Sequence, residues 1–172
     1  MTHNFNQPLA RHDSDSLKWQ RYGTALPLWV ADMDFTSPEP VLAALHERVA
    51  HGVFGYGAPP EELTETICAR MAYLYRWTVT PEQIVYLPGL VCGLNVVCRA
   101  VGEPGDGVLV QTPVYPPFLA APGHQDRRLI TAELTTEQHD GRLYYRFDAT
   151  AFEAAIDSRT RLFILCHPHN PV

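Results

Sequence analysis

Val108-Leu109-Val110-Gln111 is a short apolar segment that runs directly into Thr112-Pro113-Val114-Tyr115-Pro116-Pro117-Phe118, a stiff, proline-rich turn. A second apolar segment, Leu162-Phe163-Ile164-Leu165-Cys166, runs in the same way into His167-Pro168-His169-Asn170-Pro171. Short apolar runs bounded by turn residues are typical of strands buried on both faces of a parallel sheet. The two segments therefore predict a parallel sheet whose strands end in rigid loops.

Strands and helices alternate along the rest of the chain. Two further strands are predicted, at residues 84–87 and 129–134. Residues 135–146 are polar and predict a hairpin or loop around Asp140-Gly141. The predicted helices lie at residues 38–51, 61–77, 90–101 and 150–156, and a short helix after Phe118 is expected to end at Ala121. This alternation indicates an α/β fold with a mostly parallel sheet flanked by helices.

The ends of these helices carry recognisable signals. Ser37 is expected to cap the first long helix and Gly52 to stop it. A capping box formed by Thr150 and Glu153 is expected to start the last helix. The helix at 90–101 is apolar on nearly every side, which predicts that it is buried.

Composition narrows the class of protein. The 172 residues carry 13 Lys+Arg against 19 Asp+Glu, a net charge of −6, and 46% of them are apolar. This length and apolar fraction suit a folded domain with a core, and the acidic balance argues against nucleic-acid binding. No apolar run approaches the roughly 20 residues of a membrane span, and the first six residues lack the features of a signal peptide. A soluble, cytoplasmic protein without nucleic-acid or membrane partners is expected.

Residues with catalytic or metal-binding chemistry are sparse. Lys18 is the single lysine, so lysine chemistry in a central pocket has to use it or a residue outside this chain. Asp32 and Asp34 are interpreted as loop and cap residues. His167 and His169 lack a third ligand, so no metal site is expected. The cysteines lie in apolar segments without Cys-x-x-Cys spacing and are interpreted as buried, reduced thiols: Cys68, Cys92, Cys98 and Cys166.

A ligand site is expected where parallel strands end, in loops 88–91, 112–118 and 167–172. Gly89 precedes a helix whose first N–H groups could hold an anion, although a plain turn glycine would look the same. Tyr115 could stack on a planar ligand or plug the space under its loop. Asn170 could present an oriented amide or be an ordinary turn residue.

Longer strings of sequence are more specific than these cues. Five occur in this order: Leu26-Pro27-Leu28-Trp29-Val30-Ala31-Asp32-Met33-Asp34-Phe35, Phe54-Gly55-Tyr56-Gly57, Pro88-Gly89-Leu90-Val91, Gln111-Thr112-Pro113-Val114-Tyr115-Pro116-Pro117-Phe118 and Pro168-His169-Asn170-Pro171. Together they resemble the MalY/PatB-type cystathionine β-lyases (C–S lyases). That group is a branch of the class I/II aminotransferase superfamily, which uses pyridoxal 5′-phosphate (PLP) in the fold-type I architecture.

The resemblance implies a domain plan. Residues 1–52 would form an amino-terminal arm and small-domain segment. Residues 53–172 would form the amino-terminal part of the PLP-binding large domain, with the carboxyl-terminal half of that domain absent. The implied reaction is cleavage of a sulfur-containing amino acid into a thiol, pyruvate and ammonia.

The resemblance also implies a role for each candidate residue. Backbone N–H groups of Gly89, Leu90 and Val91 would hold the PLP phosphate. Tyr115 would stack on the pyridine ring, and Asn170 would hydrogen-bond the oxygen on that ring. Residues 29–35 would line the substrate entrance. A further tyrosine, Tyr56, would reach the phosphate in a neighbouring subunit, which implies a homodimer.

Some features depart from the family pattern. His167 stands where the family usually has Asn, and Cys92 where it often has Pro or a small residue. The Schiff-base lysine, the aspartate facing the pyridine nitrogen and the arginine for the substrate carboxylate are all expected beyond Val172. The 172 residues alone are therefore expected to have negligible lyase activity. The alternatives are a class I/II aminotransferase, a non-catalytic truncated remnant and an unrelated small α/β binding domain.

Overall fold

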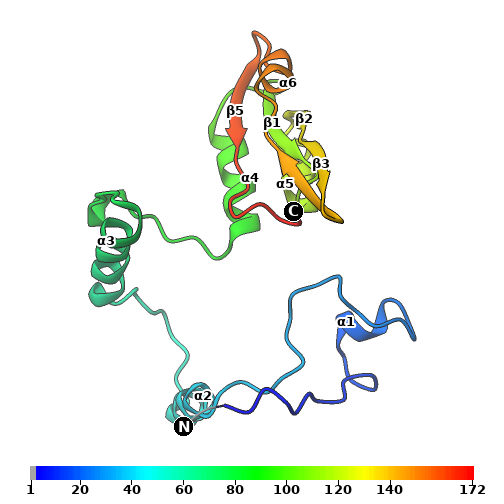
Figure 1. Ribbon diagram of the computed structural model, residues 1–172. Helices are drawn as coiled ribbons and strands as arrows, with labels where there is room; N and C mark the ends of the chain where they lie inside the picture. The colour runs from blue at the N-terminus through cyan, green and yellow to red at the C-terminus, as the bar shows by residue number, and fades with distance from the viewer. Residues whose placement is uncertain (1–2) are drawn as a thin grey trace. The chain divides into compact units, whose positions relative to one another are not determined.

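The computed structural model describes residues 3–172. The chain divides into two compact units, Met1–Glu61 and Glu62–Val172. Figure 1 labels their helices and strands. The predicted boundary after residue 52 separates the small-domain segment from the large domain of a complete fold-type I enzyme. It stays a prediction.

The first unit contains two helices, α1 (Leu17–Gln20) and α2 (Glu39–His51). The helix α2 ends as expected at Gly52, which has the left-handed φ of 75° and donates its N–H to the carbonyl oxygen of Val49. The expected cap at Ser37 is wrong, because Pro38 occupies the N-cap position and no side chain caps the helix. Pro40, which has no N–H, lies in the first turn and reduces the number of donors that need a cap.

The second unit contains most of the regular structure. Its helices are α3 (Glu61–Tyr75, which begins at the boundary between the units), α4 (Leu90–Ala100), α5 (Pro116–His124), α6 (Ala149–Ala154) and the short 3-10 helix η1 (Pro81–Gln83). Its strands are β1 (Gly107–Thr112), β2 (Arg128–Glu133), β3 (Thr135–His139), β4 (Arg142–Arg146) and β5 (Thr160–Ile164).

The three-stranded sheet is parallel, as the sequence predicts, with the order β2-β1-β5. The central strand β1 is buried along its length up to Gln111. Val108 and Val110 face one apolar cluster, which includes Leu94 of α4 and Phe118 of α5. Leu109 faces a second cluster with residues of β2 and α6. The core of the second unit therefore lies on both sides of β1.

Two strand predictions are wrong in instructive ways. Residues 84–87 form no strand, since no partner strand lies beside them in the described part of the chain. The strand β5 forms but is not buried on both faces, because it is the edge of the sheet and alternates between half-buried and exposed residues. A strand needs a neighbour, and neither local hydrophobicity nor length supplies one.

The hairpin predicted around Asp140-Gly141 is confirmed by the antiparallel pair β3 and β4. Asp140 has a φ of 49° and Gly141 a φ of 72°. Two successive residues in the left-handed region are the mark of a type I′ turn, whose twist matches that of the strands it joins.

Three helix details differ from the prediction. The helix α6 is capped by Asp148, which accepts a hydrogen bond from the N–H of Ala151, and not by Thr150. The helix α4 is buried on one face only, through Leu94 and Cys98. The helix α5 continues past residue 121 to His124 and contains Pro122.

All four cysteines are free thiols, but they are not uniformly buried. Cys98 is buried, Cys68 and Cys166 are half-buried, and Cys92 is exposed on the uncovered face of α4, contrary to the expectation of burial. Within residues 3–172, no three His, Cys, Asp or Glu side chains gather as a metal site would require. No helix in this part of the chain combines the length and hydrophobicity of a membrane span.

Candidate active site

The loops that follow β1 and β5 leave the sheet side by side. The two strands are parallel neighbours, with Val110 opposite Ile164. The N–H of Tyr115 donates a 2.8 Å hydrogen bond to the carbonyl oxygen of Asn170. The structure therefore brings together two of the predicted site residues, which are 55 positions apart in the sequence.

The helix α4 begins at the same end of the second unit (Figure 1). Leu94, one turn into α4, shares a buried cluster with Val114 and Phe118 of the loop and helix after β1. Asn95 accepts a 3.2 Å hydrogen bond from the side chain of Gln125 at the end of α5. The segment before α4 is a loop but does not follow a strand, contrary to the prediction for residues 88–91.

The start of α4 is open to an incoming group. The first hydrogen bond of the helix runs from the N–H of Gly93 to the carbonyl of Gly89, so the N–H groups of the preceding residues have no partner within the helix. Leu90 is 67% exposed and Val91 is 43% exposed. A Cβ built on Gly89 would meet no atom within 4 Å. Free N–H groups at the positive end of a helix dipole can bind an anion.

Tyr115 does not plug the space beneath its loop. It is the N-cap residue of α5, two prolines follow it, and it is 37% exposed. The buried residues of this region are Val114 and Phe118, at 7% and 4% exposure. Of the two interpretations of Tyr115 that the sequence allows, the structure favours an accessible ring.

Asn170 is held by its backbone and not by its side chain. Its carbonyl oxygen accepts from Tyr115, and its N–H donates to Sγ of Cys166 at 3.4 Å. Its side-chain amide makes no hydrogen bond to residues 3–172 within ordinary limits. The amide is therefore available to a ligand at a position that the backbone fixes.

The sequence did not single out Cys166 as part of this loop, and it treated His169 only as a doubtful metal ligand. Nε2 of His169 lies 2.8 Å from the carbonyl oxygen of Pro113, across the two loops. The only signal in the sequence was the position of Cys166 and His169, which lie on either side of Pro168 just after a predicted strand. Nothing in the local sequence specifies which backbone group each side chain reaches.

Tyr56 belongs to the first unit, in residues 53–60, which form no helix or strand. Its side chain is fully exposed. The predicted contact with a cofactor in a neighbouring subunit stays a prediction.

The single lysine is committed to an ion-pair cluster in the first unit. Nζ of Lys18 donates to Oδ2 of Asp34 at 2.8 Å, and Trp19 and Arg11 donate to Oδ1 of the same carboxylate. Arg11 also pairs with Asp32 at 2.8 Å. The hydrogen bonds from Lys18 and then Trp19 lower the pKa of Asp34 from 3.8 to about 2. The cluster fastens residues 32–34 to the arm that carries Lys18.

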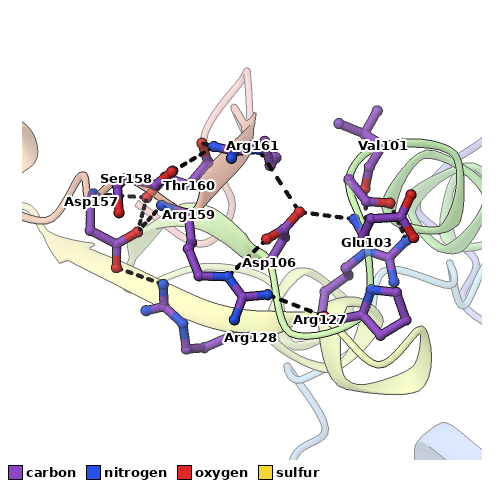
Figure 2. A network of polar contacts seen from close by, with 12 residues as sticks. Val101, Glu103, Asp106, Arg127, Arg128, Asp157, Ser158, Arg159, Thr160 and Arg161 are labelled. Atoms are coloured by element: carbon purple, nitrogen blue, oxygen red, sulfur yellow. Dashed lines mark hydrogen bonds and ion pairs between the residues drawn. The ribbon is translucent and has the colours of Figure 1, made fainter.

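At the opposite end of the sheet, where β1, β2 and β5 begin, internal polar contacts occupy the polar groups (Figure 2). Asp106, just before β1, accepts from the N–H of Glu103 at 2.9 Å and from Nε of Arg159 at 3.1 Å. The bond from Glu103 is the largest cause that lowers the pKa of Asp106. Arg127 donates to the carbonyl oxygens of Val101 and Gly102 at the end of α4.

The two ends of the sheet therefore differ in which hydrogen-bonding groups they leave without a partner. The carbonyl groups at the end of α4 are occupied by Arg127, whereas the N–H groups at its start are not. The free N–H groups at the start of α4, the ring of Tyr115 and the side-chain amide of Asn170 all lie at the end of the sheet where β1 and β5 finish. Ligand sites in parallel sheets usually lie at this end.

Comparison with known proteins identifies the family. The sequence profile of aminotransferase class I and II matches residues 26–172. Cystathionine beta-lyase PatB of Bacillus subtilis (strain 168) is 40% identical over 175 residues, which cover 98% of this chain and 44% of PatB. Arginine–pyruvate transaminase AruH of Pseudomonas aeruginosa is 31% identical over 148 residues, which cover 85% of this chain and 36% of AruH.

A solved structure gives the same result. Cystalysin from Treponema denticola, whose crystal structure contains a PLP cofactor, matches with a TM-score of 0.84 and 32% identity, over 99% of this chain and 45% of that chain. This confirms the predicted fold, a partial large domain of the fold-type I enzymes. The chain spans less than half the length of these relatives. It belongs to the aminotransferase class I and II family, with the resemblance to PatB that its motifs predict.

Proposed function

We propose that this chain is the amino-terminal, cofactor-binding part of a PLP-dependent carbon–sulfur β-lyase. The enzyme would release a thiol, pyruvate and ammonia from a sulfur-containing amino acid such as cystathionine. The observation that carries the proposal is the hydrogen bond between Tyr115 and Asn170, which pairs two loops beside the open start of α4. The similarity to PatB, a cystathionine beta-lyase, favours this reaction within the family.

The groups left free at this end of the sheet fit PLP in number and kind. N–H groups at Gly89, Leu90 and Val91 would hold the phosphate dianion at the helix start. The accessible ring of Tyr115 would lie against the pyridine ring. The side-chain amide of Asn170 would donate to the oxygen on that ring. PLP, when bound, supplies an electron sink for the carbanion formed at the substrate Cα.

The residues of this chain would therefore bind and orient, while the proton transfer needs a lysine. Lys18 is 9% exposed and paired with Asp34, so it does not fill this role. We assign the lysine, together with the arginine for the substrate carboxylate, to sequence beyond Val172. Residues 29–35 would line the substrate entrance. Tyr56 would complete the site of the neighbouring subunit in a cytoplasmic homodimer.

A class I/II aminotransferase is the second candidate. The family profile and the 31% identity to a transaminase favour it. Both reactions begin with removal of the same substrate proton and diverge afterwards. The proposed contacts of Gly89, Leu90, Val91, Tyr115 and Asn170 are common to both reactions, since these residues would touch the cofactor and not the leaving group.

Two observations test the proposal. The coding sequence read past Val172 should continue in frame and supply a lysine in a Ser-x-x-Lys motif, whereas a stop codon there would favour a non-catalytic remnant. The protein that contains this lysine should release pyruvate from cystathionine without a keto acid. Amino transfer that depends on a keto acid, without pyruvate release, would favour the aminotransferase.

A further inference from the structure

His169 has no role in the proposed cofactor contacts, yet it joins the two loops that make them. Its Nε2 atom lies 2.8 Å from the carbonyl oxygen of Pro113. A carbonyl oxygen only accepts hydrogen bonds, so Nε2 carries the hydrogen. Pro113 is two residues before Tyr115, and His169 is the residue before Asn170. The bond therefore lies next to both predicted ring contacts.

The loop after β5 has few other ties. The outer side of β5 has no partner strand among residues 3–172, because β5 is an edge strand of the sheet. Across to the loop after β1, one backbone bond joins Tyr115 to Asn170 and one side-chain bond joins His169 to Pro113. The contact between Asn170 and Cys166 is internal to the loop after β5 and does not restrain it against its neighbour. Loss of the imidazole bond would leave one hydrogen bond between the two loops, beside the packing of Cys166 against the apolar cluster that contains Val114.

We propose that His169 is a positioning residue for the cofactor ring. Its imidazole fastens the loop of Asn170 to the loop of Tyr115, so that the amide and the aromatic ring reach one pyridine ring together. This inference rests on the proposed function. The inference gives a role to the half-buried imidazole of His169. No metal-binding group of side chains forms among residues 3–172 that would give it another.

Three variants of the full chain test the inference. His169→Phe keeps an aromatic ring but removes the donor, and His169→Gln restores an N–H donor. His167→Phe is the matched control, because His167 is exposed and makes no side-chain hydrogen bond within the described residues. Affinity for PLP is measured by absorbance titration. Affinity for inorganic phosphate, which needs only the start of α4, is measured separately.

His169→Phe should bind PLP about tenfold more weakly, the effect of one lost hydrogen bond at the upper end of the usual range. Its affinity for inorganic phosphate should be unchanged. His169→Gln should recover most of the PLP affinity, and His167→Phe should bind PLP like the wild type. Unchanged PLP affinity in His169→Phe, no recovery in His169→Gln, or an equal loss of phosphate affinity would overturn the positioning role.

A measurement on the wild type covers the case in which His169→Phe does not fold. The Nε2 hydrogen of His169 should give an imidazole signal in ¹H–¹⁵N NMR spectra and exchange more slowly with solvent when PLP is added. Unchanged exchange with PLP bound would refute the positioning role alone. If the wild type binds no PLP, the cofactor contacts proposed for this chain fail, and this inference fails with them.

Discussion

Asp34 is the shared hydrogen-bond acceptor in the arm of the first unit. Its carboxylate accepts from Lys18, Trp19 and Arg11 at 2.7–3.1 Å. Because these bonds favour the ionised form, the pKa in the folded state is about 2 and lies below the ordinary value of 3.8. The stabilisation is therefore complete above about pH 4 and is lost as the pH falls toward 2.

The first prediction follows from this depressed pKa. The indole N–H signal of Trp19 should keep its bonded chemical shift at neutral pH and lose it as the pH falls through about 2, the pKa of Asp34 in the folded state. Asp34→Asn should show the acid-state signal already at pH 7. Asp15→Asn, at an exposed carboxyl on the same arm, should behave like the wild type. An Asp34→Asn spectrum that matches the wild type at pH 7 would contradict this role.

Gly107 is required for close packing and not for its backbone conformation. A Cβ at this position would overlap the side chain of Ile130, which is 8% exposed and has little room to move. Gly107→Ala should lower the free energy of unfolding by about 1–3 kcal/mol, as overpacked cores do. Gly123→Ala, in α5 with open space around it, should instead raise it by about 0.5–1 kcal/mol. Urea denaturation measures both, and equal effects would refute this explanation.

At the scale of the element, the start of α6 separates two candidate caps. Asp148 accepts from the N–H of Ala151 at 3.0 Å, whereas the sequence pattern favoured Thr150. Asp148→Ala should cost about 1 kcal/mol of unfolding free energy. Thr150→Ala should change it by a few tenths of a kcal/mol at most. If urea denaturation shows a larger loss for Thr150→Ala than for Asp148→Ala, Thr150 is the cap, as the sequence pattern predicted.

How far the sequence predicts an element depends on where its partners lie. The apolar run at 108–111 became a central strand, while the similar run at 84–87 found no partner. Gly52 and the pair Asp140-Gly141 act through their own backbone, so their roles were readable locally. The adjacency of Tyr115 and Asn170 also followed from a rule, because parallel strands end at one edge. The reach of His169 to Pro113 depends on the final packing and could not be read in advance.

In the whole molecule, the edge strand β5 is the feature that most favours association between copies of the chain. The outer side of β5 has no partner in the described chain, and Leu165 just beyond it is 58% exposed. Unpaired, apolar edges associate. The 172-residue chain should therefore form oligomers that grow with concentration in light scattering. Leu165→Lys should suppress this growth, and Leu143→Lys, at an equally exposed site on the hairpin, should not. A monomer that unfolds cooperatively at high concentration would contradict the prediction.

The most direct test of the whole proposal is to map bound PLP by amide chemical shifts in the folded chain. Addition of PLP should move the signals of Gly89, Leu90, Val91, Tyr115 and Asn170 together, with one dissociation constant. Signals at the opposite end of the sheet, such as those of Asp106 and Arg159, should stay in place. Shifts confined to that opposite end, or no saturable shift at either end, would contradict a PLP site where β1 and β5 end.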